Sequence, residues 1–111
     1  MKEITWDDFE DIELRVGTII KVEDFPEARK PAYKLEIDFG KEIGIKKSSA
    51  QITELYKKQE LIDKQVMCVI NFPPKQIGNF MSECLTTGFI NEKGVILAVP
   101  DKQTKNGLKL A

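Results

Sequence analysis

Residues 33–39 read Tyr-Lys-Leu-Glu-Ile-Asp-Phe, an unbroken alternation of apolar and charged side chains. Because successive side chains of a β-strand point to opposite faces, this pattern predicts a strand with one face in the core and the other in solvent. A similar alternation precedes it, with a predicted apolar face of Leu14, Val16, Ile20 and Val22. Pro26 and Pro31 lie between the two stretches and cannot join a regular ladder, so we expect a connecting loop there.

The remaining chain adds short strands and two helices. Thr5 with Asp8 three positions later is typical of a helix start, and Trp6, Phe9 and Ile12 follow at helical spacing. After Gly40, Ser48 and Ser49 are predicted to cap a second helix. That helix is expected to carry Ile52, Leu55 and Tyr56. Further strands are predicted at residues 43–47, 66–70, 80–87 and 95–99, with a last short segment at 108–110.

Many short strands, with one helix between the third and the fourth, are typical of a five-stranded Greek-key barrel of the OB type. We therefore predict an all-β OB-fold with a short N-terminal helix, one internal helix and extra strands at the C-terminal end. A small α+β sandwich is the alternative. The 111 residues fit one domain over residues 1–111, in which 1–13 form a helical extension.

Catalytic and metal chemistry have little support in the sequence. The chain has no histidine, which is the most common general base near neutral pH and the most common metal ligand. No nucleophile-elbow, phosphate-loop or paired-carboxylate pattern is present. Cys68 and Cys84 have no partner at metal-ligand spacing and are expected to be buried free thiols, with a regulatory disulfide as the alternative. We expect no enzyme activity, metal or cofactor.

The charges are unevenly distributed. Residues 1–14 hold six acids and one lysine, giving −5, so the total of −1 leaves +4 for residues 15–111. The net positive charge of residues 15–111 is compatible with an anionic partner but does not require one. Arg15 is expected to pair with Asp11 or Glu13. No apolar run approaches the length of a membrane span, and the first residues lack a signal peptide, so we expect a cytoplasmic protein without membrane insertion.

Several stretches together resemble the tRNA-binding domain family. They are DIELRVGTI at 11–19, FPEA at 25–28, DFG at 38–40, NFPPKQIG at 71–78 and FMSE at 80–83. This OB-fold module occurs in the EMAP II-like cytokine precursor, at the end of some methionyl-tRNA synthetases and in free-standing tRNA-binding proteins. The resemblance covers nearly the whole chain.

At two segments the sequence differs from many members of this family and resembles the CsaA subgroup. Residues 48–50 are Ser-Ser-Ala where many members have Ser-Gly-Leu, and residues 82–85 are Ser-Glu-Cys-Leu where they have Ser-Glu-Gly-Met. The resemblance implies a stand-alone homodimer, chaperone-like and related to protein export. It also implies that unfolded or precursor polypeptides are bound.

Two groups of residues are candidates for peptide or tRNA binding. The first combines cations and hydroxyls near the predicted start of the second helix, where an anion would be favoured: Lys46, Lys47, Ser48, Ser49 and Gln51. The second mixes an amide, aromatics, a cation and an adaptable thioether: Asn71, Phe72, Lys75, Phe80, Met81, Ser82 and Glu83. The alternatives are that the serines only cap the helix, the lysines are only solvated, and the apolar members only fill the barrel end.

Two functions follow. A dimeric chaperone-like module would bind extended polypeptide, largely independently of salt. A tRNA-binding module would instead bind folded RNA with an affinity that falls steeply with salt.

Overall fold

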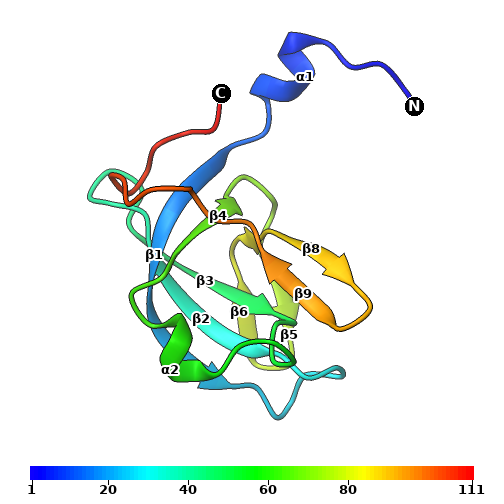
Figure 1. Ribbon diagram of the computed structural model, residues 1–111, viewed down its shortest axis with the longest axis vertical. Helices are drawn as coiled ribbons and strands as arrows, with labels where there is room; N and C mark the ends of the chain where they lie inside the picture. The colour runs from blue at the N-terminus through cyan, green and yellow to red at the C-terminus, as the bar shows by residue number, and fades with distance from the viewer.

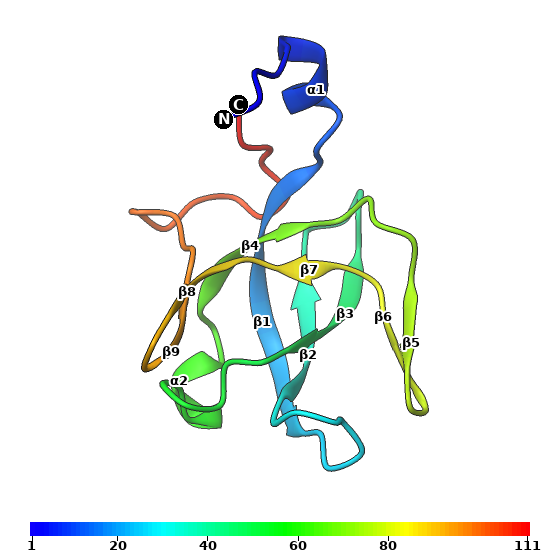
Figure 2. The ribbon, with the colours of Figure 1, turned by 90° about the vertical axis from the view of Figure 1, so that its right-hand side faces the viewer.

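Five antiparallel strands form the central sheet, in the order β3-β2-β1-β4-β7 (Figures 1 and 2). The computed structural model describes residues 1–111. The strands are β1 (Leu14–Asp24), β2 (Tyr33–Asp38), β3 (Ile45–Ala50), β4 (Gln65–Val69) and β7 (Leu85–Thr86). The two sheet edges meet, because Glu83 donates its backbone N–H to the Lys47 carbonyl at 2.8 Å. The Ser48 and Thr86 hydroxyls bond across the same seam at 2.8 Å. This nearly closed five-stranded barrel confirms the predicted all-β OB-fold.

Strand β2 supplies the centre of the core, as its alternation predicts. Tyr33, Leu35, Ile37 and Phe39 are all buried. Gly17 on β1 lies under two of them: a Cβ added there would stand 2.5 Å from Ile37 Cγ2 and 2.7 Å from the Phe39 ring. Only a residue without a side chain lets β2 pack so closely on β1.

Of the predicted apolar face of β1, only Val22 packs against the core cluster; Val16 is buried but lies outside that cluster, and Leu14 and Ile20 are not part of it. Ile19 is fully buried, whereas Ile20 is exposed. The register against β2 shifts between Ile19 and Lys21, which marks a β-bulge. The extra residue reverses the alternation, so the core side passes from Gly17 and Ile19 to Val22.

The two helices are short. Helix α1 (Trp6–Glu10) has the predicted capping box: Thr5 Oγ1 accepts the Asp8 N–H at 3.1 Å and Asp8 Oδ2 accepts the Thr5 N–H at 2.9 Å. Helix α2 (Lys58–Leu61) lies between β3 and β4 as the OB-fold requires, and its Leu61 is fully buried. Neither helix has the length and apolar character needed to cross a membrane.

The prediction that Ser48 and Ser49 cap a helix carrying Ile52, Leu55 and Tyr56 is wrong. Both serines lie within β3, and Ser48 pairs with Leu35 of β2. Backbone bonds to β2 therefore hold the segment as a strand, and the helix begins only at Lys58.

The predicted strand at 80–87 is broken in two. Its first part, β6 (Phe80–Ser82), folds back on β5 (Lys75–Ile77) as a hairpin, and its second part is β7. A further hairpin pairs β8 (Gly88–Asn91) with β9 (Gly94–Leu97). Figure 2 shows the β5–β6 and β8–β9 hairpins on opposite sides of the barrel.

The last residues extend the sheet along β1. Val16 donates its N–H to the Leu108 carbonyl at 3.1 Å, and Leu110 donates to Leu14 at 2.8 Å. Because β2 pairs only with residues from Thr18 onward, the C-terminal segment occupies the free part of the same β1 edge. This confirms the predicted segment at 108–110.

Candidate ligand-binding clefts

The fold joins the two predicted groups of site residues. The Lys47 backbone N–H donates to Glu83 Oε1 at 2.9 Å. The Ser49 N–H donates to Ser82 Oγ at 3.2 Å. Strand β3 and the end of β6 therefore form one surface, although they are more than thirty residues apart in sequence.

Alternation along β3 separates its side chains into two faces. Lys46 and Ser48 lie on one face, and Lys47 and Ser49 lie on the other. Ser48 is fully buried and its hydroxyl donates to the Cys84 carbonyl at 3.1 Å. Ser48 thus closes the barrel, while Ser49 remains half-buried at the surface.

A cleft of about 710 Å³ opens beside this surface, between the β5–β6 hairpin, the end of β3 and the loop before β2. We call it the hairpin cleft. Its lining residues are Glu27, Ala28, Arg29, Lys30, Ala32, Ser49, Gln51, Lys75, Gln76, Ile77 and Gly78. Three of the predicted site residues, Ser49, Gln51 and Lys75, are among them.

The hairpin cleft carries unpaired positive charge. Arg29, Lys30 and Lys75 are exposed, and none of them takes part in an ion pair of the structure. Glu27 is the one acidic residue that lines the cleft. Free cations in a concave site attract carboxylates or phosphates from a ligand.

The apolar members of the second group divide between structure and surface. The Phe80 ring packs edge-on against Phe25, with 5.4 Å between centroids, and so fixes the hairpin on the loop before β2. Met81 lies on the opposite face of the hairpin from Phe80 and is exposed, as is Phe72. These two side chains are free to contact a ligand or another chain.

Asn71 ties the N-terminal extension to the barrel. Its Oδ1 accepts the Glu13 N–H at 3.1 Å, and its Nδ2 donates to the Asp11 carbonyl at 2.7 Å. Both ends of its amide are therefore occupied within the chain.

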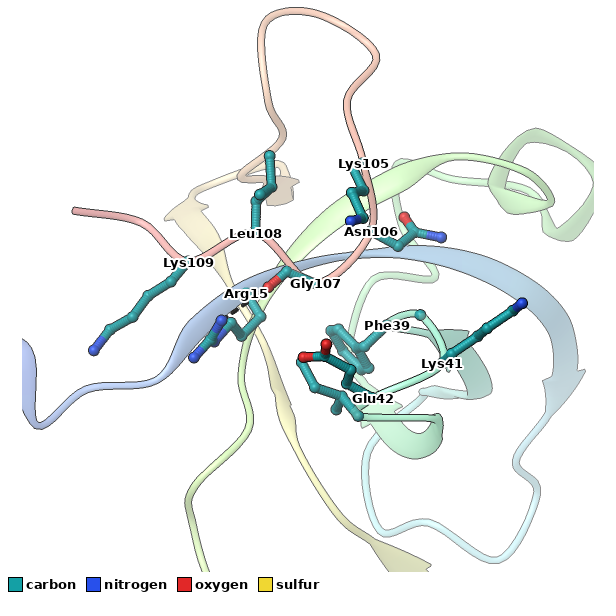
Figure 3. Close-up of a pocket in the computed structure, with 11 residues that line it drawn as sticks. Arg15, Phe39, Lys41, Glu42, Lys105, Asn106, Gly107, Leu108 and Lys109 are labelled. Atoms are coloured by element: carbon teal, nitrogen blue, oxygen red, sulfur yellow. Dashed lines mark hydrogen bonds between the residues drawn. The ribbon is translucent and has the colours of Figure 1, made fainter.

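A second cleft, of about 690 Å³, lies at the other end of β2, between the 40–44 turn and the C-terminal segment (Figure 3). We call it the terminal cleft. Its cations are partly neutralised. The Arg15 guanidinium contacts Glu13 at 2.6 Å, which confirms the predicted ion pair, and donates to the Gly107 carbonyl at 2.9 Å. Lys109 contacts the same carboxylate at 3.0 Å. These two cations lower the pKa of Glu13, Arg15 having the larger effect.

Arg29 and Lys30 were not among the predicted site residues. They stand between Pro26 and Pro31 in a loop whose position depends on the hairpin that packs on it, through Phe25 and Phe80 and through the approach of Glu27 to Gly78. The one signal in the sequence is a basic pair within a proline-bounded loop.

Cys68 and Cys84 are both buried free thiols, as predicted. A hydrogen bond with the Cys84 thiol, together with burial, raises the pKa of Cys68. Cys68 is thus protonated at neutral pH, where a thiol is a weak nucleophile.

The sequence matches the tRNA binding domain family over residues 14–109. The chain belongs to this family. Relatives include the methionine–tRNA ligases of Pyrococcus horikoshii, 36% identical over 110 residues, and Pyrococcus abyssi, 35% identical over 107 residues. The match covers 99% and 96% of this chain but only 15% and 14% of those ligases, so the chain spans about one seventh of their length.

Two solved structures similar to this member of the family are described as chaperones. The CsaA chaperone protein from Picrophilus torridus is 57% identical, with a TM-score of 0.93 over 98% of this chain and 100% of that one. Chaperone CsaA from Bacillus anthracis is 44% identical, with a TM-score of 0.92 over 99% and 100%. The resemblance to the CsaA subgroup is thus confirmed over nearly the whole chain.

Proposed function

We propose that the protein is a dimeric, chaperone-like module of the cytoplasm that binds extended or unfolded polypeptide, in a role related to protein export. The observation that carries this proposal is the 57% identity to a CsaA chaperone protein over 98% of the chain. In this proposal the module binds polypeptides, called its clients below, and catalyses no reaction on them.

The hairpin cleft is the proposed client site. It offers free cations at Arg29 and Lys75, hydrogen-bonding groups at Ser49 and Gln51, and the apolar side chain of Ile77. Such a mixture accommodates backbone, acidic and apolar groups of different polypeptides. The flexible Met81 side chain, exposed on the same hairpin, suits varied apolar partners.

Self-association is proposed through the N-terminal extension. Helix α1 projects from one end of the barrel and has no buried residue (Figures 1 and 2). Its Trp6 is 79% exposed and Ile4 is 64% exposed. A second copy that covers these side chains would remove apolar area from water. Two copies of one cleft would then bind a long chain with avidity.

The alternative function is binding of tRNA, and it is favoured by membership of the tRNA-binding domain family. Phosphates would contact the free cations of the hairpin cleft, and Phe72, which is 54% exposed, would offer a stacking surface.

Titration of a labelled unfolded peptide and of labelled tRNA at low and high ionic strength separates the two functions. Polypeptide binding predicts a peptide affinity that falls far less with salt than that of tRNA, because only a few charges are engaged. Tight tRNA binding that collapses at high salt, with no peptide binding, would establish the alternative instead.

A further inference from the structure

The hairpin cleft does not end at the β5–β6 hairpin. A smaller hollow of about 260 Å³ adjoins it beside the β8–β9 hairpin, and Lys30 and Gln51 line both. The two hollows therefore adjoin at Lys30, in the loop before β2, and Gln51, at the end of β3, and we call the two hollows together the groove.

The groove has opposite charges at its two ends. Arg29 and Lys75 line the end at the β5–β6 hairpin, whereas Glu54 and Glu92 line the end at the β8–β9 hairpin. None of these four side chains takes part in an ion pair. With Lys30 and Glu27 included, the charged lining sums to zero.

The acidic end also carries an apolar side chain. Ile90 is 90% exposed and lines the smaller hollow. Its cross-strand partner Val95 lines the same hollow and packs against the core, so this face of the hairpin is turned toward the barrel. An isoleucine so exposed beside a hollow is a ready contact for an apolar side chain of a ligand.

We infer that this groove selects extended polypeptide segments of mixed charge, with acidic residues at the Arg29 and Lys75 end, basic residues at the Glu54 and Glu92 end, and an apolar residue on Ile90. The inference rests on the proposed polypeptide-binding function and names its substrate class. It distinguishes polypeptide from nucleic acid, because a phosphate backbone is negative along its whole length and would be repelled by Glu54 and Glu92.

Two synthetic peptides test the inference. Each has about ten residues, which span about 33 Å when extended, close to the 34 Å middle dimension of the molecule. Both have a central leucine. The mixed peptide has aspartates at one end and lysines at the other, and the acidic peptide has aspartates at both ends. An oligouridine RNA is the third ligand, and binding is measured by fluorescence anisotropy.

The deciding variant is the double substitution Glu54→Lys and Glu92→Lys, and the matched control is Glu42→Lys with Asp101→Lys. The control makes the same charge change at exposed positions outside the groove. Wild-type protein should prefer the mixed peptide by about fivefold to tenfold, as two exposed ion pairs allow. The groove variant should reverse this preference, and the control should not.

Three results would overturn the inference. If the wild type binds both peptides equally and the groove variant leaves both affinities unchanged, selection by charge is wrong while polypeptide binding stands. If the wild type binds neither peptide, the proposed function fails as well. If oligouridine binds more tightly than the mixed peptide, nucleic acid is the occupant of the groove.

Discussion

The packing of the barrel leaves no space for a side chain at Gly17. An alanine Cβ at this position would stand 2.5 Å from Ile37 Cγ2 and 2.7 Å from the Phe39 ring, both within the core. We expect Gly17→Ala to destabilise the protein by about 3 kcal/mol, the upper range for overpacking. Urea unfolding followed by circular dichroism measures this change.

A double-mutant cycle supplies the control for Gly17. In a Phe39→Leu background the added methyl group has more space, so Gly17→Ala should destabilise the protein less than it does in the wild type. Equal losses in both backgrounds would show that the Phe39 ring is not what excludes a side chain at Gly17.

Ser48 and Ser49 are neighbours with different roles. Ser48→Ala removes a fully buried hydroxyl that donates to the Cys84 carbonyl at 3.1 Å and bonds the Thr86 hydroxyl at 2.8 Å, so we expect a loss of stability of about 1–3 kcal/mol and unchanged ligand affinity. Ser49→Ala removes a half-buried hydroxyl that lines the hairpin cleft. Its stability should change by less than about 0.5 kcal/mol, and its peptide affinity should fall. Thermal unfolding and peptide titration of both variants check this; the opposite pattern would contradict the assigned faces of β3.

Glu13 should make stability depend on acid pH. Its pKa in the folded state is lowered below 4.5 by the Arg15 and Lys109 contacts. Above pH 4.5 the carboxylate is ionised in both states, so the stabilisation is fully present. As the pH falls toward the folded-state pKa, the unfolded state binds the proton first and the stabilisation is lost. The difference in urea midpoint between wild type and Glu13→Gln should therefore shrink below about pH 4.5; a constant difference would be incompatible with this ion pair.

At the level of elements, secondary structure is predicted best where a residue pattern is typical of one kind of element only. The alternation of residues 33–39 predicts β2 correctly, and Thr5 with Asp8 predicts the capping box of α1. The pattern fails at Ile19 and Ile20, because both are isoleucine and nothing local indicates which is the bulged position. The prediction of a helix start at Ser48 fails because strand pairing with Leu35, which is distant in sequence, overrides the local preference of serine for a helix start.

Helix α1 is the element that tests self-association. Trp6 is 79% exposed in the single chain, and we expect it to be covered by a second copy. Trp6→Ala should shift the dimer dissociation constant upward by about tenfold or more, because buried tryptophans dominate interface energetics. Sedimentation velocity over a range of protein concentrations measures the shift. Phe89→Ala is the control, since it removes another exposed aromatic, 67% exposed, from the β8–β9 hairpin. A monomeric wild type would contradict the proposed dimer.

At the scale of the whole molecule, the barrel brings together groups that the sequence keeps apart. The loop with Arg29, the end of β3 and the β5–β6 hairpin meet because β3 and the segment between β6 and β7 are joined through Lys47 and Glu83, which closes the barrel. The sequence identifies Ser49, Gln51 and Lys75 as candidates, and the fold adds the cations of the loop. Ile90 and Glu92 join the groove through the β8–β9 hairpin, which sequence periodicity predicts only in part, and Glu54 joins it from the turn after β3.

The central claim is that extended polypeptide lies in the hairpin cleft of the barrel. The most direct measurement is the mapping of amide chemical shifts by NMR while an unfolded polypeptide is titrated into the protein. We predict that the largest shifts fall at residues 27–32, 49–51 and 75–78, with small changes around the terminal cleft. Shifts concentrated at residues 40–44 and 105–109, with none at the β5–β6 hairpin, would contradict the claim.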